Sequence, residues 1–163
     1  SLDIDGNDYW ILNEINIESD LVVCEYNPIL GDLHELTIPY EKKFDRKNKH
    51  FSNLFFGCSI QALIQLMKKK NYIFLGTNTQ GMNAFFINKR KLKYVEHKIK
   101  EKKIFFPMTR EGREKDGKLN YKTIFENLKL IENEQIYDIR KKEIKKISDF
   151  KNLYSDKWII KKS

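Results

Sequence analysis

Leu21-Val22-Val23-Cys24-Glu25-Tyr26 is the stretch from which the fold is predicted. Its apolar residues show little alternation, which is typical of a strand that is covered on both faces. Pro28 follows soon after and ends the run, because proline has no backbone N–H to donate to a neighbouring strand. We therefore predict an inner strand of a layered α/β domain.

Strand and helix patterns alternate on both sides of this run. A short strand over residues 2–5 precedes a helix that Asp8 would cap, and a helix over residues 59–71 precedes a hairpin over residues 72–87. Two strand-helix-strand passes imply right-handed crossovers between parallel strands. The predicted fold class is α/β, with a Rossmann-like, mostly parallel sheet that ends in an antiparallel edge hairpin.

Residues 28–57 form a long connection without a steady hydrophobic period. It includes the aromatic stretch Phe51 to Phe56. Connections of this length inside a compact domain are usually functional or disordered. The aromatic content favours an ordered flap that faces a substrate.

The charge is divided unevenly along the 163 residues. Residues 1–88 hold 8 Lys and Arg against 11 Asp and Glu, whereas residues 89–163 hold 23 against 12. This predicts an α/β unit over 1–88 and a basic, largely helical C-terminal appendage over 89–163. Because only 5 of the 31 basic residues are Arg, whose forked guanidinium suits base recognition, we do not expect nucleic-acid binding.

Targeting signals and cysteine usage indicate the compartment. No apolar run approaches the ~18 residues of a membrane span, and no secretory signal is visible. Cys24 and Cys58 stand in apolar contexts without metal-ligand spacing, as free thiols do in a reducing compartment. We predict a cytoplasmic protein.

Carboxylates crowd the start of the chain, Ser-Leu-Asp-Ile-Asp-Gly-Asn-Asp (residues 1–8). Like charges this close repel, unless a cation, backbone donors or a ligand hydroxyl compensates. Asp5 would lie at the carboxyl end of the first strand, and Glu25 and Asn27 at that end of the next, ~4.8 Å away. Such an oxygen set suits Mg²⁺, so Asp5, Glu25 and Asn27 are candidate metal ligands. Asp5 and Asn7 could instead serve only to bond turn amides.

Two further interpretations concern this region. His50 could act on a substrate if the long connection folds over the site. A calcium-binding loop is the alternative interpretation, because six residues occupy the ligand positions of an EF-hand. They are Asp3, Asp5, Asn7, Tyr9, Ile11 and Glu14. Asp8 stands where that loop needs glycine, which argues against it.

The Asp5-Gly6 turn, the strand ending in Glu25-Tyr26-Asn27, and the stretches over residues 55–59 and 81–86 together resemble class I SAM-dependent methyltransferases of the FkbM-like group. The resemblance covers residues 1–88. It implies the C-terminal half of a methyltransferase domain, with Asp5 as the catalytic residue that orients or deprotonates an acceptor hydroxyl. Asn7, Glu25, Asn27 and His50 would be substrate-binding residues, with Mg²⁺ as a possible cofactor.

The family's Gly-rich loop, which binds S-adenosylmethionine (SAM), would lie upstream of these motifs. The resemblance therefore implies that a missing N-terminal half, or a second chain, completes the sheet and binds SAM. The implied function is methyl transfer to a hydroxyl of a saccharide or related small molecule, in cell-surface polysaccharide biosynthesis. The alternative is a non-catalytic module that binds a saccharide or protein through Phe51 to Phe56.

Overall fold

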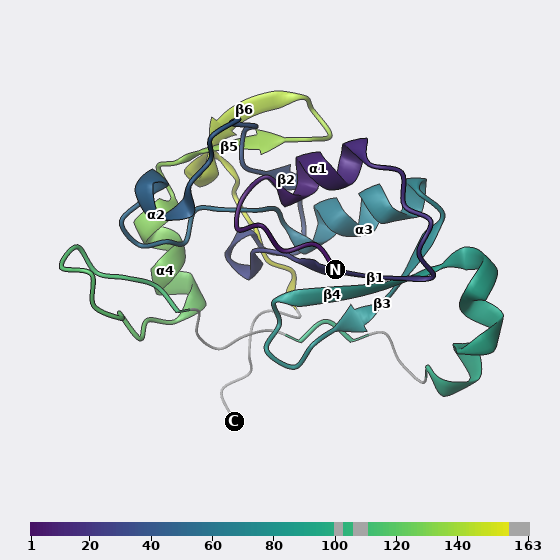
Figure 1. The fold of residues 1–163 in the computed structure, drawn as a ribbon. Coiled ribbons are helices and arrows are strands. Elements are labelled where there is room, and N and C mark those ends of the chain that lie inside the picture. Colours follow the sequence, from purple (N-terminus) through teal and green to yellow (C-terminus); the bar gives the residue numbers. More distant parts are fainter. Residues whose placement is uncertain (100–102, 106–110, 157–163) are drawn as a thin grey trace.

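The computed structural model describes residues 1–99, 103–105 and 111–156, so part of the predicted C-terminal appendage lies outside the described residues. These residues form two three-stranded antiparallel sheets (Figure 1). The first has the order β1-β4-β3, with β1 (Leu21–Glu25), β4 (Asn83–Asn88) and β3 (Tyr72–Thr77). The second has the order β2-β5-β6, with β2 (Leu36–Thr37), β5 (Gln135–Asp138) and β6 (Glu143–Lys146).

Helices occupy much of the remaining chain. The α-helices are α1 (Asp8–Glu14), α2 (Arg46–Lys49), α3 (Ile60–Lys69) and α4 (Ile124–Ile131). Short 3-10 helices are η1 (Pro28–Leu30), η2 (Lys89–Tyr94), η3 (Glu96–Lys98) and η4 (Ile147–Asp149). In the part of the chain that the structure describes, no helix is long and apolar enough to cross a membrane.

The predicted parallel, Rossmann-like sheet is wrong. The hairpin strand β4 does not add to one edge; it lies between β1 and β3 and pairs antiparallel with both. The prediction of an inner strand covered on both faces is wrong as well, because β1 lies at an edge of the sheet and its burial alternates along the strand. An apolar run such as that of β1 therefore does not distinguish parallel from antiparallel pairing. Among the described residues, parallel pairing is limited to the single bridge between Leu2 and Cys24.

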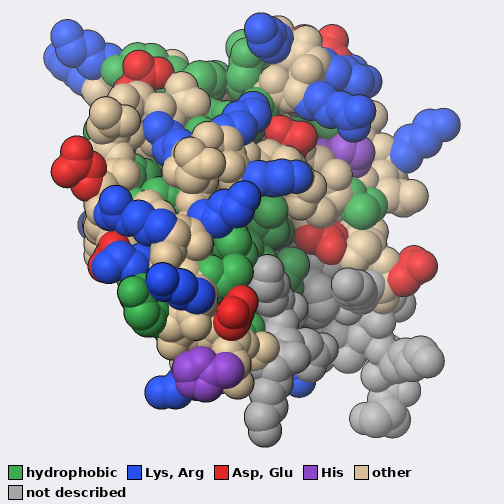
Figure 2. All heavy atoms as spheres, turned by 90° about the vertical axis from the view of Figure 1, so that its right-hand side faces the viewer, with side chains coloured by type: hydrophobic (Ala, Val, Ile, Leu, Met, Phe, Trp, Pro, Cys, Tyr) green, Lys and Arg blue, Asp and Glu red, His purple; other side chains and the backbone are tan. Residues whose placement is uncertain are grey.

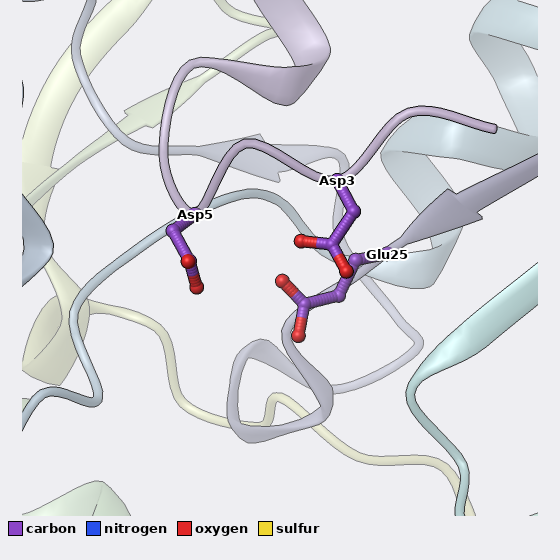
Figure 3. A group of neighbouring side chains, drawn as sticks. All are labelled: Asp3, Asp5 and Glu25. Carbon is purple, nitrogen blue, oxygen red and sulfur yellow. The ribbon is translucent and has the colours of Figure 1, made fainter.

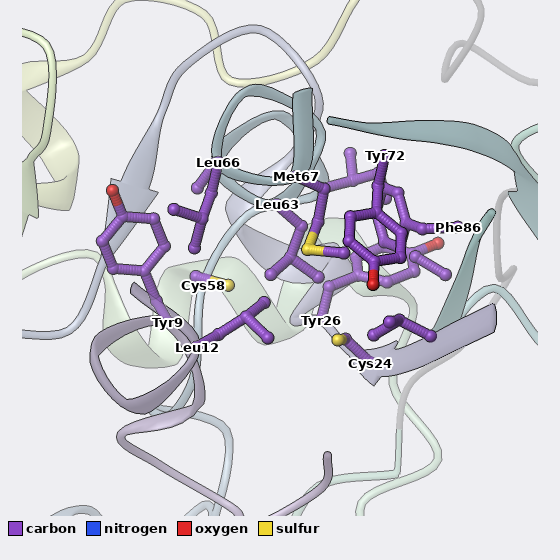
Figure 4. Packing of buried hydrophobic residues seen from close by; sticks show 14 residues of the cluster. Tyr9, Leu12, Cys24, Tyr26, Cys58, Leu63, Leu66, Met67, Tyr72 and Phe86 are labelled. Carbon is purple, nitrogen blue, oxygen red and sulfur yellow. The ribbon is translucent and has the colours of Figure 1, made fainter. Parts of the chain in front are cut away.

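The first sheet, together with α1 and α3, forms what we call the first region. Figure 1 shows both helices on one face of the sheet, and Figure 4 shows the core between them. Tyr9 and Leu12 of α1 and Leu63, Leu66 and Met67 of α3 pack here against residues of the three strands. Ser59 caps α3, because its hydroxyl accepts a hydrogen bond from Ala62 N at 3.2 Å.

The second sheet and α4 form what we call the second region. Its core combines residues from the long connection, such as Leu36, Leu54 and Phe55, with later residues such as Ile124 and Ile136. The core thus draws on both sides of the boundary predicted after residue 88. A largely helical appendage is wrong as well, because β5 and β6 pair with β2.

The aromatic stretch of the predicted flap is divided between core and surface. Phe55 and Phe56 are 2% and 1% exposed and belong to the core, whereas Phe51 is 38% exposed. The two cysteines are free and buried, as the sequence predicted. Burial raises the pKa of Cys24 to about 12, which makes its thiolate scarce at neutral pH.

Candidate functional site

The turn between Leu2 and α1 is held by a buried carboxylate. Asp8 accepts hydrogen bonds from Ile4 N and Gly6 N, both at 2.9 Å. Burial raises the pKa of Asp8, and these two bonds act against that rise. The bonds flank Asp5, whose backbone is left-handed with φ of 57°. Asp8, the first residue of α1 rather than its predicted cap, therefore fixes the turn that presents Asp5.

Gly6 is required by close packing. A Cβ atom at this position would lie 2.2 Å from Cδ1 of Phe44. The Phe44 ring thus packs directly against the turn, and a larger residue at position 6 would push the ring and the turn apart.

Three carboxylates gather at the end of β1 (Figure 3). One oxygen from each of Asp3, Asp5 and Glu25 lies within 4.8 Å of the others. Asp3 and Asp5 are exposed, whereas Glu25 is the more buried member. Asp5 and Glu25 converge because the segment at Leu2 bridges to β1, which brings their ends together. Sequence reasoning left Asp3 out of this set, although it stands two residues before Asp5 in the strand predicted over residues 2–5, where alternate side chains would share a face.

A fixed cation contacts this acidic cluster. Arg46 forms an ion pair with Asp5, and its Nε donates to Asn53 O at 2.6 Å. The guanidinium carbon also lies 3.7 Å from the ring centroid of Phe56, within range of a cation–π interaction. These contacts leave the Arg46 side chain only 18% exposed, against 62% for Asp5. Arg46 therefore orients a carboxylate that solvent or a ligand can still reach.

Asp5 and Arg46 border a polar cavity of about 570 Å³, a volume typical of small-molecule sites. The lining residues are Ile4, Asp5, Phe44, Asp45, Arg46, Lys47, Asn53, Glu111 and Arg113. Arg113 pairs with Glu111 at 3.3 Å, and its backbone N–H donates to Ser52 O at 3.0 Å. The cavity thus presents both carboxylates and guanidinium groups, which accept and donate hydrogen bonds respectively.

Asn27 and Asn7 have structural partners. The buried amide of Asn27 donates to Leu54 O at 2.8 Å and Phe56 O at 3.1 Å, and it accepts from Ile29 N at 3.1 Å. Asn7 donates to Glu41 O at 2.8 Å, which ties the turn to the chain beyond β2. Asn27 therefore holds the long connection in place instead of turning to the acidic cluster.

His50 is not among the residues that line the cavity. Its Nδ1 lies 2.7 Å from Ser52 Oγ and accepts from Ser52 N at 3.2 Å, which places the proton of the neutral ring on Nε2. Burial lowers the pKa of His50. The side chain therefore stabilises its own loop as a neutral imidazole.

The alternative interpretation, a calcium-binding loop over residues 3–14, is wrong. Residues 8–14 form α1, so Tyr9, Ile11 and Glu14 lie on a helix instead of wrapping around an ion. The acidic cluster itself fits Mg²⁺ by donor type, with Asp3, Asp5 and Glu25 as the residues that would hold it. Arg46 already supplies a positive charge to Asp5, which weakens the attraction for a second cation.

SAM does not fit the described residues around this site. Charged and polar side chains line the cavity, whereas adenine needs an apolar slot. Gly6, the glycine nearest to Asp5 in the chain, is closed off by Phe44. Compared with known proteins, the chain matches no family model, no curated protein sequence and no solved structure. These comparisons therefore add nothing to the functional argument, which rests on the geometry, the residue types and the sequence motifs quoted above.

Proposed function

We propose that this chain binds the acceptor of a methyl-transfer reaction, a saccharide or related small molecule with a reactive hydroxyl. The observation that carries the proposal is the position of Asp5, which lines a polar cavity beside Arg46 and also belongs to the acidic cluster with Asp3 and Glu25. The resemblance to FkbM-like SAM-dependent methyltransferases supplies the reaction. SAM would be bound by an N-terminal half or a second chain, outside the residues described above.

Hydroxyl groups match the donors and acceptors of the site. A sugar hydroxyl donates to a carboxylate such as that of Asp5, and its oxygen accepts from a guanidinium such as that of Arg113. Hydrogen bonds to charged groups contribute about 1.5–3 kcal/mol, which suits recognition of a polar ligand in an open cavity. The same exposed cavity offers little to an apolar ligand.

Asp5 is the residue that we expect to act on the acceptor. Its carboxylate is exposed at the cavity, while Arg46 and the Asp8-bound turn fix its direction. A carboxylate held in this way orients the hydroxyl and accepts its proton as the oxygen is methylated. Alignment of the reacting groups would contribute most of the rate.

The ion pair with Arg46 favours a hydroxyl over a metal ion as the partner of Asp5. A carboxylate that shares its charge with a guanidinium binds Mg²⁺ less tightly than a free one, whereas it still accepts a hydrogen bond from a hydroxyl. We therefore place the acceptor hydroxyl, rather than Mg²⁺, at Asp5. A magnesium titration that showed tight binding would reverse this order.

The second candidate is a non-catalytic saccharide-binding module. It is favoured by the poor fit of SAM to the described cavity, since the same carboxylates and guanidinium groups can hold a sugar without any reaction. The module would use Asp5 and Arg46 as binding residues only. The two candidates thus predict the same saccharide contacts and differ in methyl transfer.

Saccharide binding is the first test. A glycan panel identifies a ligand, and titration then compares the wild type with Asp5→Asn and with Asp20→Asn, a control that removes an exposed acid elsewhere. We expect Asp5→Asn to weaken binding about ten-fold or more, because a charged acceptor is lost, and Asp20→Asn to have no effect. Equal binding by wild type and Asp5→Asn, or no saccharide bound, would contradict the proposal.

Methyl transfer is the second test. The whole natural protein is incubated with the identified saccharide and SAM that carries a labelled methyl group. Labelled saccharide in the wild type, and its loss in Asp5→Asn, would support the transferase. Saccharide binding without any transfer would favour the module instead. Saturable SAM binding by residues 1–163 alone would contradict our placement of the donor site.

A further inference from the structure

One end of the molecule gathers positive charge from two separate segments. No Asp or Glu occurs between residues 46 and 95. The end of α3 and the start of η2 lie side by side, because Lys89 N donates to Asn71 O at 2.9 Å. This contact assembles a surface that we call the basic face. It comprises Lys68, Lys69, Lys70, Lys89, Arg90, Lys91, Lys93 and Lys98.

The basic face keeps most of its charge in the folded protein. Figure 2 looks onto this end of the molecule, where Lys and Arg side chains outnumber Asp and Glu. Asp20 neutralises part of the face, since it lies 3.1 Å from Lys91 Nζ and 3.6 Å from Arg90 Nη2. Lys70 is engaged with backbone carbonyls of Asn13 and Ile15, both at 2.9 Å. Glu96, in η3 beside Lys98, is a second exposed acid at this surface. The basic residues still outnumber these two acids, so the net charge of the face is positive.

Apolar and aromatic groups stand among these lysines. Tyr94 is 62% exposed, and the amino groups of Lys91 and Lys93 lie 5.9 and 5.1 Å from its ring centroid. Leu92, between the two lysines, is half-buried. Lysines that flank an exposed tyrosine are typical of segments that lie at a membrane–water interface, where the ring sits at the headgroup level.

We propose that the basic face docks this protein onto the surface of an anionic lipid bilayer. Clusters of four to eight basic residues suffice for such binding, at about 1 kcal/mol for each Lys or Arg near the surface. Lysine ammonium groups act as point charges and suit a fluid layer of phosphate and carboxylate headgroups. Base recognition in nucleic acid relies instead on guanidinium forks, and Arg90 is the one arginine of the basic face.

The test uses the full chain and vesicles. One set is about 30% phosphatidylserine in phosphatidylcholine, and a second set is phosphatidylcholine alone. We expect co-sedimentation with the anionic set only, and its loss as salt is raised to about 0.5 M, because the attraction between the face and the headgroups is screened. Equal binding to both sets would overturn the proposal.

Matched variants separate the face from total charge. Lys89→Gln, Arg90→Gln, Lys91→Gln and Lys93→Gln combined should weaken binding about 100-fold. The control removes the same charge from the β5–β6 hairpin through Lys141→Gln, Lys142→Gln, Lys145→Gln and Lys146→Gln. We expect it to weaken binding less than about ten-fold. Equal losses in the two variants would overturn the assignment to this face.

Two further measurements sharpen the result. Asp20→Asn releases Arg90 and Lys91 from their acidic partner, so we expect vesicle binding about two- to five-fold tighter than wild type. A duplex DNA probe tests the other large polyanion. DNA binding that was tighter than vesicle binding, and lost in the face variant, would overturn the membrane in favour of nucleic acid.

Discussion

The first region and the second region are similar in strand number but differ in how the chain builds them. The first sheet combines β1 with the hairpin of β3 and β4, whose strands are six residues long. The second combines a two-residue strand, β2, with a hairpin that lies about 100 residues later, β5 and β6. The chain passes from the first region to the second and back before it completes either one. Each region therefore needs the other for its connections, and we expect the two to fold together.

Core truncations test this expectation with the largest effects. Phe86→Ala removes a fully buried ring from the central strand of the first sheet, and Ile136→Ala removes a fully buried side chain from β5. We expect losses of about 4 and about 3 kcal/mol in the free energy of unfolding. Urea unfolding followed by circular dichroism and by fluorescence should show one shared transition in each variant. Separate transitions, with only one shifted by Phe86→Ala, would show that the regions unfold independently.

Substitutions at two helix caps compare Ser59, which joins the two regions, with Thr123, which does not. The Ser59 hydroxyl caps α3, accepts from Leu36 N at 3.1 Å and donates to His34 O at 2.6 Å. Thr123 caps α4 within an exposed capping box. We expect Ser59→Ala to cost about 2 kcal/mol and Thr123→Ala about 1 kcal/mol, because only the first leaves buried backbone groups without partners. Thermal unfolding measures both, and equal losses would argue against Ser59 as a link.

The pH dependence of Asp8 gives the smallest expected effect. Burial raises its pKa in the folded chain, so the folded state holds this proton more tightly than the unfolded state. The contribution of Asp8 to stability therefore falls as the pH rises from about 4 through the raised pKa, and it is constant above that range. Asp8→Asn does not titrate, so the stability of wild type relative to this variant should decrease across the same window. Urea unfolding at several pH values measures this, and an increase would contradict it.

The sequence predicted local elements of the first region well. Periodicity located α3 and Ser59 as its cap, and the turn residues between β3 and β4 predicted their antiparallel pairing. Strand order was not predictable in the same way, because the apolar pattern of β1 fits either a parallel or an antiparallel neighbour. β6 reads Glu-Ile-Lys-Lys and lacks an apolar face, so nothing local distinguishes it from a charged loop.

The site, like the fold, was predicted where local sequence carries the signal and missed where the contact is long-range. Asp5 and Glu25 were expected to meet because each follows a strand, and their oxygens do converge. Arg46 was missed because its pairing with Asp5 spans 41 residues and leaves no local pattern. Asn27 was predicted to face the acidic cluster, but its amide donates to the carbonyls of Leu54 and Phe56. The sequence does not distinguish a polar residue at a strand end that faces a ligand from one that bonds buried carbonyls.

The interleaved path of the chain through the second region has a practical consequence. The core of this region is supplied by two lengths of chain, one before residue 58 and one after residue 111. Two separately expressed polypeptides, residues 1–99 and residues 103–163, would each carry half of that core. Their recombination would bury Leu36 and Phe55 against Ile124 and Ile136 again. The two polypeptides could therefore serve as the halves of a split reporter. Each would be fused to one of two proteins, and association of those proteins would be detected as reassembly of this core.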